Sequence, residues 1–511
     1  MSQVRTTPAS HRGTRVLETR HLLMILFATH LPITSLWAIV PNVLQAGNVV
    51  ATPLIFLLTG VILLGFVTSY ANMARRLRHP GGLYVQITHG LGRPAGLGAA
   101  AVSLVGYLTL GAVLFNFIGL VLHGLTVSLF DVDLPIPVLI VAAIIAVSAL
   151  GMLGLLTVVR LFTGVAVIQG LALALFVVGA FTQPAGGHVS LIGLSPNWLL
   201  SGSLGIALCY ALTSSVGTDV GVNYNNELVD PERSVPRASY LAYGLMTAVL
   251  ALSALAVSVA GGPEQVSDGN GQGGVPLMAT VVVSIVGVEH AAAVTNCILV
   301  LLILGLLATG ITYQNAISRQ LAGLARDRVL PVDLSFQHPG TRLVLRLFYP
   351  IAAGVIALLV PRSVVYGVPL WLVIGSGLCV LTTLTLAAAA AFVWFLHGSE
   401  GDENLLGWEG PVVAGAFSVV VAGGCVLYGI THVSSFGSGT PGNASWYVAA
   451  MIVLPFALGV GIALVFRMTD PSRYRAIGRL GYGSGGRDWA ADEATSPPPN
   501  VPSPIREEAR W

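Results

Sequence analysis

Two ionisable side chains, His30 and Asp219, lie in the middle of long apolar stretches of the sequence. Of the 22 acidic residues only Asp219 falls within the body of such a stretch, and of the 11 histidines only His30 does. An ionisable group at membrane depth costs about 2.5 to 3.5 kcal/mol on insertion scales, so it is retained where it binds something or carries a proton. These two positions are therefore candidates for ligand binding and for proton exchange.

Both residues stand beside sequences that interrupt a regular helix. Pro32 follows His30 closely, removes one backbone donor and disfavours helical geometry at Leu31. In a bilayer, an interrupted backbone survives only where it is buried in protein or lines a watery cavity. Both interruptions therefore predict a cavity. The residues that weaken the helix around Asp219 are Ser214, Ser215, Gly217, Thr218 and Gly221.

Polar residues recur at helical spacing around Asp219 and again further along the chain. Each set is predicted to share one helix face. A simpler interpretation is that these small and polar side chains hold two membrane helices together. For His30, the simpler interpretation is that its ring forms a hydrogen bond with a backbone carbonyl group that Pro32 leaves without a partner. The sequence leaves both interpretations open. The two sets are Ser215, Asp219, Asn223 and Asn226, and Thr309, Thr312, Asn315 and Arg319.

The elements that must position these residues are membrane helices. The 511 residues are 55% hydrophobic and only 9% charged, whereas an ordinary soluble domain is roughly 25% charged. A helix needs about 20 mostly apolar residues to cross the hydrocarbon layer. Continuous apolar runs exclude the alternating strands of a barrel. The twelve predicted spans are 21–47, 52–74, 95–125, 135–156, 160–182, 201–225, 237–260, 290–318, 345–361, 366–396, 411–431 and 445–467.

The placement of the basic residues predicts the orientation. All 24 are arginine, and if the N-terminus is cytoplasmic, 23 of the 24 fall in cytoplasmic segments and only Arg362 falls outside. Basic residues accumulate on the cytoplasmic side of membrane proteins. The first apolar run is too long for a cleaved signal peptide. The sequence therefore predicts a multi-pass protein of the plasma membrane with both termini in the cytoplasm.

Interrupted helices at the first and sixth positions suggest two five-helix repeats of inverted topology, because an odd number of spans makes the second unit enter from the opposite side. The predicted fold is an all-α integral membrane protein with 12 transmembrane helices, in which helices 1 and 6 are discontinuous and two helices are peripheral. The predicted domains are an N-terminal segment 1–20, a first repeat 21–182, an inverted repeat 201–396, helices 11 and 12 at 411–467 and a disordered cytoplasmic tail 468–511.

Three segments carry motifs of a known family. Residues 69–96 contain Pro-Gly-Gly-x-Tyr followed by Gly-Arg-Pro, and residues 216–238 contain a glycine and an acid followed by Glu-x-x-Asp-Pro-x-Arg-x-x-Pro-Arg. Residues 315–331 read Asn-Ala-x-x-Arg followed by Arg-Asp-x-x-Leu-Pro. With these motifs the chain resembles the amino acid-polyamine-organocation permeases, in their bacterial amino acid permease branch, over roughly residues 20–345.

The resemblance implies a five-plus-five inverted-repeat fold with alternating access, in which helices 1 and 6 unwind beside the substrate. Family members commonly hold a substrate carboxylate on a Gly-x-Gly turn of helix 1, which is missing between His30 and Thr34. Some proton-coupled members carry a lysine where this chain has Gln169, which cannot titrate. The predicted substrate-binding residues are His30, Leu31, Pro32, Ile33, Thr34, Tyr107, Ser214, Ser215, Gly217, Asp219 and Thr309, with Asp219 also predicted to couple transport to protons.

The predicted function is a secondary active transporter that takes up an amino acid, an amine or polyamine, or a related small metabolite. Asp219 has two roles that stay open, as a proton carrier or as the countercharge of a cationic substrate. The coupling ion is a proton, with sodium as the alternative. The competing functions are export or antiport of a metabolite, and a membrane sensor that keeps the fold without transporting.

Other classes of function find no support in the sequence. No phosphate-binding loop, nucleophile elbow or HExxH motif is present, so neither an enzyme nor a cofactor is predicted. The four cysteines stand singly, which predicts no metal site. The arginines are spread along the membrane boundary, so no nucleic acid is expected. The predicted partners are a small-molecule substrate, a proton or sodium ion, and the lipid bilayer.

Overall fold

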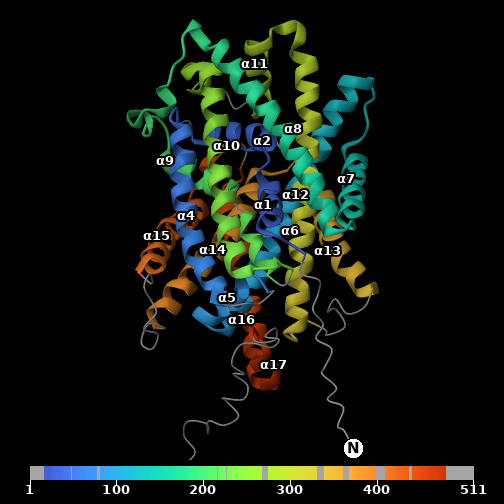
Figure 1. The fold of residues 1–511 in the computed structure, drawn as a ribbon, viewed down its shortest axis with the longest axis vertical. Helices are drawn as coiled ribbons and strands as arrows, with labels where there is room; N and C mark the ends of the chain where they lie inside the picture. The colour runs from blue at the N-terminus through green and yellow to red at the C-terminus, as the bar shows by residue number, and fades with distance from the viewer. Residues whose placement is uncertain are drawn as a thin grey trace, which may run out of the picture.

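The computed structural model describes residues 16–47, 49–76, 81–215, 217–225, 227–267, 274–330, 339–360, 368–397, 409–436 and 440–478. Within these ranges the protein is helical, and the one extended pairing is a single bridge between Leu17 and Leu228. Figure 1 shows a bundle of long helices, with α17 (Pro471–Ala476) at one end and α11 (Gly274–Val286) at the other. We call these the lower end and the upper end.

The predicted membrane spans are present as helices. In the described part of the chain, 11 helices are long and apolar enough to cross a membrane. The remaining predicted span, 135–156, contains a shorter apolar helix of 16 residues, α7 (Ile136–Gly151). The 12-helix, all-α membrane fold is thus confirmed. The other spans are formed by α1 (Thr19–Phe27) with α2 (Pro32–Thr34) and α3 (Val40–Gly47), α4 (Thr52–Arg76), α6 (Arg93–Phe130), α8 (Leu155–Thr182), α9 (Leu204–Ser214), α10 (Pro231–Ser267), α12 (Val288–Arg326), α13 (Pro339–Leu359), α14 (Leu370–His397), α15 (Glu409–Thr431) and α16 (Ala444–Thr469).

The first membrane helix is interrupted beside His30. After α1 the chain forms a short 3-10 turn, η1 (Ala28–His30), then Leu31 is extended with a ψ of 148°, and the helix resumes at Pro32. Proline suits the first position of a helix because the N–H it lacks would have no intrahelical partner there. A π-helical stretch, Ser35–Ile39, follows and leads into α3. The backbone of this span is therefore irregular on both sides of Pro32.

The sixth membrane helix is interrupted at Gly217. Its first part, α9, ends at Ser214, and Gly217 then takes a φ of +117°, which glycine adopts without the steric cost of a Cβ. The chain continues as a 3-10 helix, η6 (Thr218–Tyr224). This break faces the first one, since η6 packs against α1 and α12 packs against both η1 and η6.

The prediction that the polar set around Asp219 shares one face of an α-helix is wrong. It assumes a period of 3.6 residues through Ser215, whereas the chain turns at Gly217 and winds more tightly beyond it. The Ser215 hydroxyl consequently points backwards and donates to a carbonyl oxygen one turn earlier at 2.6 Å. Asn223 stays on the side of Asp219, since both line one small cavity. Asn226 lies outside the described residues.

Two groups of unbroken helices enclose the interrupted ones. On one side α4 and α10 pack along each other, and α1 lies on α10. On the other side α6 packs against α12, α13 and α14. The two breaks lie in the middle of the bundle in Figure 1, between its lower and upper ends.

Three short helices lie outside the predicted spans because they are too short for a search based on apolar length. They are α5 (Leu83–Leu91) and α17 at the lower end, and α11 at the upper end. The helix α17 falls at the start of the predicted tail, where Asp470 caps its first turn by accepting from the Arg473 N–H at 3.1 Å. The rest of that tail, from residue 479, lies outside the described residues.

Candidate functional site

A cavity of about 980 Å³ lies against both helix breaks. It extends from the breaks away from the lower end, because its lining includes Asn42 on α3, beyond the first break, and Phe117 in the half of α6 that is farther along the chain from α5. We call it the upper cavity. Its lining residues are Thr29, His30, Thr34, Ala38, Ile39, Asn42, Leu110, Val113, Leu114, Phe117, Tyr210, Thr213, Ser214, Leu306, Thr309, Tyr313, Val373 and Ile374.

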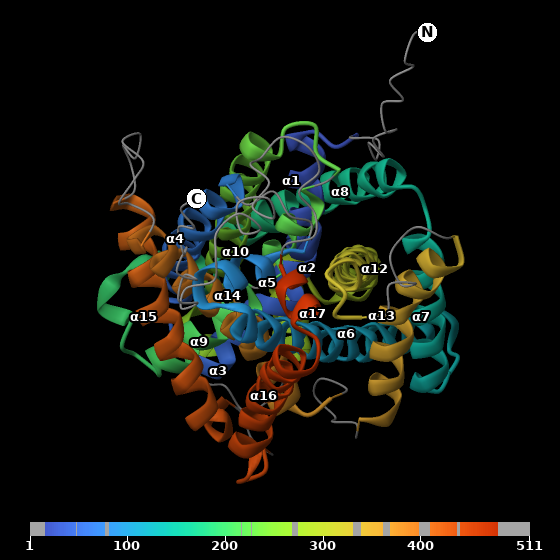
Figure 2. The ribbon, with the colours of Figure 1, turned by 90° about the horizontal axis from the view of Figure 1, so that it is seen from below.

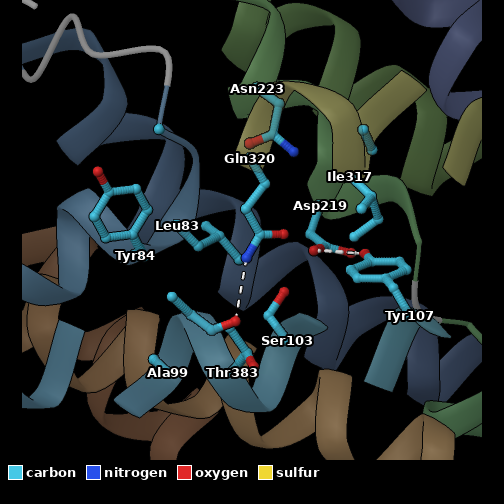
Figure 3. A pocket seen from close by; sticks show the side chains of 13 residues that line it. Leu83, Tyr84, Ala99, Ser103, Tyr107, Asp219, Asn223, Ile317, Gln320 and Thr383 are labelled. Atoms are coloured by element: carbon cyan, nitrogen blue, oxygen red, sulfur yellow. Dashed lines mark hydrogen bonds between the residues drawn. The ribbon is translucent and has the colours of Figure 1, made fainter. Parts of the chain in front are cut away.

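A second and smaller cavity of about 370 Å³ lies on the lower side of Tyr107. Figure 3 shows its lining, in which Ser103, Asn223 and Gln320 join Asp219 as polar side chains. We call it the lower cavity. The two cavities are separated by aromatic rings: Tyr107 lines the lower one, Tyr313 lines the upper one, and their ring centroids are 5.2 Å apart.

The carboxylate of Asp219 is buried and bound by neutral donors. The Tyr107 hydroxyl lies 2.7 and 2.8 Å from its two oxygens, and the backbone N–H of Gly217 donates to Oδ1 at 3.1 Å (Figure 3). Among the described residues no arginine or histidine forms an ion pair with it. A buried carboxylate without a cationic partner is free to take up a proton or to neutralise a cationic ligand.

The ring of His30 joins the two helix breaks. Its Nε2 lies 3.0 Å from the carbonyl oxygen of Ser214 at the end of α9, and its Nδ1 lies 2.8 Å from the Thr29 hydroxyl. Because a carbonyl oxygen only accepts, Nε2 carries the proton in the first of these contacts. The simpler interpretation is therefore right that the ring satisfies a carbonyl, but this carbonyl belongs to the other broken helix.

Gln169 on α8 holds the first break, and the sequence singled it out only as a residue that cannot titrate. Its Oε1 accepts the backbone N–H groups of Ile33 at 2.9 Å and Thr34 at 3.4 Å, and its Nε2 donates to the carbonyl oxygen of Leu301 at 2.8 Å. This amide orientation is fixed, since the reverse one would set NH₂ against two donors. A polar side chain within the apolar run of α8 was the signal that could have identified it.

The predicted site residues separate into three groups. His30, Thr34, Ser214 and Thr309 line the upper cavity, whereas Tyr107 and Asp219 line the lower one. The others shape the backbone of the breaks without lining either cavity. This third group is Leu31, Pro32, Ile33, Ser215 and Gly217.

Below the lower cavity, Arg319 and Glu227 form an ion pair. Arg319 Nε and Nη2 lie 2.9 and 3.0 Å from the two carboxylate oxygens, and its guanidinium carbon lies 4.1 Å from the centre of the Tyr224 ring. The pair joins α12 to the segment after η6, and only 12% of the Arg319 side chain is exposed. Arg319, the last residue of the second polar set, thus joins α12 to the segment after η6, whereas Thr309 of the same set lines the upper cavity.

Backbone hydrogen bonds near Leu17 also join segments at the lower end. The N–H groups of Val16 and Leu17 both donate to the carbonyl oxygen of Glu227 at 3.0 Å, and the Val229 N–H donates to Leu17 at 3.0 Å. The segment before α1 is thereby fixed to the segment before α10. A movement of the first helix at this end has to break these bonds.

The segment after α17 closes the lower end from the other side. Gly478 donates its N–H to Asp327 Oδ2 at 3.0 Å, and Tyr84 donates its hydroxyl to the same oxygen. Ile477 is 1% exposed and packs in a cluster with Tyr84 and Leu324. In Figure 2, which views the molecule from below, α17 lies near the centre of the lower face beside α5.

Comparison with known proteins agrees with this architecture. The model of the amino acid permease family matches residues 22–456. No curated protein matches the chain. Among solved structures, the chain is similar to the crystal structure of MhsT in complex with L-phenylalanine, with a TM-score of 0.51 and 14% identity over 88% of this chain and 99% of that one. At that identity the likeness concerns the fold alone.

Proposed function

We propose, from the premise that this chain belongs to the amino acid permease family, that it is a proton-coupled secondary transporter that imports its substrate across the plasma membrane by alternating access. As a permease it is a membrane transporter of amino acid-like substrates and not an enzyme. The finer parts of the proposal are the coupling, the direction and the location. The substrate class considered is an amino acid, an amine or polyamine, or a related small metabolite.

One observation carries the proposal: the upper cavity ends on two broken helices while the lower end is closed beneath it. A transporter needs a central site that one end exposes and the other shields. The carboxylate of Asp219 lines the lower cavity and is bound to Tyr107, whose ring lies between the two cavities. This position suits a group that binds a proton from one side and releases it to the other.

The arginine distribution supports a cytoplasmic lower end, since α17 with Arg473 and Arg475 lies there and Arg20 at the start of α1 lies on the same side of the first break. The cavity that is open in this structure would then face the outside, which supports uptake. Export, antiport and a sensor without flux are the competing functions. Epitope tags at both termini, probed in intact and permeabilised cells, test the orientation.

Uptake by proteoliposomes tests the transport function. Labelled amino acids and amines are supplied with an inward pH gradient, and we expect accumulation that a protonophore abolishes. Equilibration without accumulation would contradict proton coupling, and replacement of the pH gradient by a sodium gradient tests the other ion. Ligand binding without any flux would favour the sensor.

A further inference from the structure

We propose that the upper cavity takes amines that lack a free carboxylate and carry a bulky apolar body. This proposal rests on the transport function proposed above and names the chemical class of its substrate. The observation behind it is that the two breaks offer a ligand several hydrogen-bond acceptors but few donors.

The N–H groups at the first break are already used within the protein. The first turn of the resumed helix comprises residues 32–35, and Pro32 has no N–H. Ile33 and Thr34 donate to Gln169 Oε1, and Ser35 donates to the carbonyl oxygen of Leu31 at 2.8 Å. A backbone N–H donates once, whereas a carbonyl oxygen can accept twice. This helix start therefore offers no amide to a ligand carboxylate.

At the second break, too, a backbone N–H group donates within the protein. The N–H of Gly217, next to the start of η6, donates to Asp219 Oδ1 at 3.1 Å. A side-chain oxygen of the protein thus accepts a backbone N–H at each break, beside the place where a broken helix would otherwise present amides to an anion. Gln169 supplies it at the first break and Asp219 at the second.

Three of the hydroxyl groups on the lining also direct their protons inward to the protein. Thr213 donates to the carbonyl oxygen of Cys209 at 2.9 Å, Ser214 to that of Tyr210 at 2.6 Å, and Thr309 to that of Gly305 at 3.1 Å. Their oxygens keep lone pairs that accept from a ligand. The lining therefore presents acceptors to an amine.

No positively charged arginine lines the upper cavity, and the chain has no lysine. Both ring nitrogens of His30 are engaged, one with Ser214 and one with Thr29. The neutral donors on the wall include the hydroxyls of Thr34 and Tyr313, whereas the Asn42 amide already donates to the carbonyl oxygen of Ala38 at 2.6 Å. A carboxylate would lose its hydration here without a cation to replace it, which is costly in a low-dielectric site.

An ammonium group, by contrast, finds compensation at the floor of the cavity. Tyrosine rings attract cations; the ring of Tyr313 lines the cavity, and the ring of Tyr107 lies behind it at a centroid distance of 5.2 Å. Asp219 lies beyond these rings and supplies the negative charge. The upper walls are apolar and include Leu110, Phe117 and Val373 in a cavity of about 980 Å³. They suit a body much larger than a methyl group.

The test uses four ligands with one phenyl body on the purified full-length protein: phenethylamine, phenylalanine amide, phenylalanine and phenylpropionate. They carry an amine alone, an amine with a neutral amide, both charges, and a carboxylate alone. We expect the two ligands without a carboxylate to bind at least about tenfold more tightly than phenylalanine, and phenylpropionate not to bind. Phenylalanine binding as tightly as its amide overturns the proposal, and so does the absence of binding by all four.

The variant Gln169→Ala then tests the stated cause. It frees the N–H groups of Ile33 and Thr34, so the ratio of phenylalanine affinity to amide affinity should rise about tenfold. Gln320→Ala is the matched control, because Gln320 is also a buried glutamine but lies on the lower cavity, where it donates to Ala100 at 3.3 Å. An unchanged ratio in Gln169→Ala overturns the role of Gln169. The wild-type ligand series decides the substrate class even if this variant does not fold.

Flux measured in the same proteoliposomes separates this proposal from the proposed function. Amine binding without flux contradicts transport and leaves the ligand class standing. Accumulation of phenylalanine in preference to its amide contradicts the ligand class and leaves transport standing.

Discussion

The two ends of the molecule are held by different chemistry. At the lower end, charged and backbone groups join segments far apart in the sequence: Arg319 to Glu227, the stretch around Leu17 to that around Leu228, and Asp327 to Gly478. Above the two breaks, the walls of the upper cavity consist of apolar and hydroxyl side chains and the Asn42 amide, without an aspartate, glutamate or arginine. The lower end is therefore closed by specific polar contacts and the upper end is open between apolar surfaces.

This difference indicates how each end can change between an open and a closed state. A directional polar contact is either made or lost, so a few of them define a discrete closed state. Apolar walls approach one another without such pairing and gain by excluding water. We therefore expect the lower end to open by breaking named bonds, and the upper end to close by collapse around a ligand.

Asp219 lies between the two ends, and its substitution should have the largest effect on transport. Asp219→Asn keeps a side-chain oxygen that can accept from Tyr107 and Gly217 but removes the negative charge and the site for a proton. We expect accumulation driven by a pH gradient to be lost, as measured by uptake in proteoliposomes. Glu289→Gln is the control, because Glu289 is an exposed acid in the first turn of α12. Wild-type accumulation in Asp219→Asn would remove Asp219 from the coupling mechanism.

Loss of the ion pair at the lower end should have the next largest effect. Glu227→Gln leaves the largely buried Arg319 without its partner, and breaking a buried pair costs about 3 kcal/mol, less here because 34% of the Glu227 side chain is exposed. We expect faster reaction of a cysteine introduced at Ser103, in the lower cavity, with a membrane-impermeant maleimide. The parent protein without Ser103→Cys corrects for its native cysteines.

The exchanged pair Glu227→Arg with Arg319→Glu sharpens that result. The exchange restores opposite charges but moves the guanidinium away from Tyr224, which it now faces at 4.1 Å. We expect the labelling rate at Ser103→Cys to fall between those of wild type and Glu227→Gln. Labelling equal to wild type in Glu227→Gln would show that the ion pair does not keep this end closed.

The segment after α17 should contribute less than the ion pair. Ile477→Asp places a carboxylate in the cluster with Tyr84 and Leu324, so the apolar burial of the side chain, worth about 1.5 to 3 kcal/mol, is lost. We expect a smaller increase of labelling at Ser103→Cys. The matched control is Arg475→Ala, because Arg475 is exposed in the same short helix. Equal labelling of both variants would mean that this segment does not seal the lower end.

Acidification should leave this segment in place over the physiological range. Hydrogen bonds from the Ser472 hydroxyl and the Arg473 N–H hold the pKa of Asp470 below its ordinary value of 3.8. A lowered folded-state pKa gives stability that is present above the unfolded value and lost only as the pH falls through the folded one. We therefore expect Asp470 to stay ionised between about pH 5 and about pH 8, so that any change in the labelling of Ser103→Cys over this window is the same with and without Asp470→Asn. A pH dependence that Asp470→Asn abolishes would contradict this expectation.

The sequence was sufficient to predict the spans and both breaks, and insufficient for the contacts between them. Apolar length and the positions of Pro32 and Gly217 act locally, so they can be read along the chain. The contact of Gln169 with Ile33 depends on the rotation of two helices about their axes, which a single sequence does not fix. The pairing of Arg319 with Glu227 has the same origin. A helix as short as α11 escapes any search for long apolar runs.

The smallest effect is expected at the open upper end, where no single bond holds the walls. Phe117→Ala removes one aromatic wall of the upper cavity, and the loss of that apolar contact should weaken the binding of phenethylamine about tenfold. Ethylamine, which is too small to reach this wall from the floor of the cavity, should bind as in wild type. Because the upper walls share no polar contact with the lower end, labelling at Ser103→Cys should stay unchanged without ligand. A changed rate would show that the upper walls already hold the lower end closed, and the two ends could no longer be treated as separate closures.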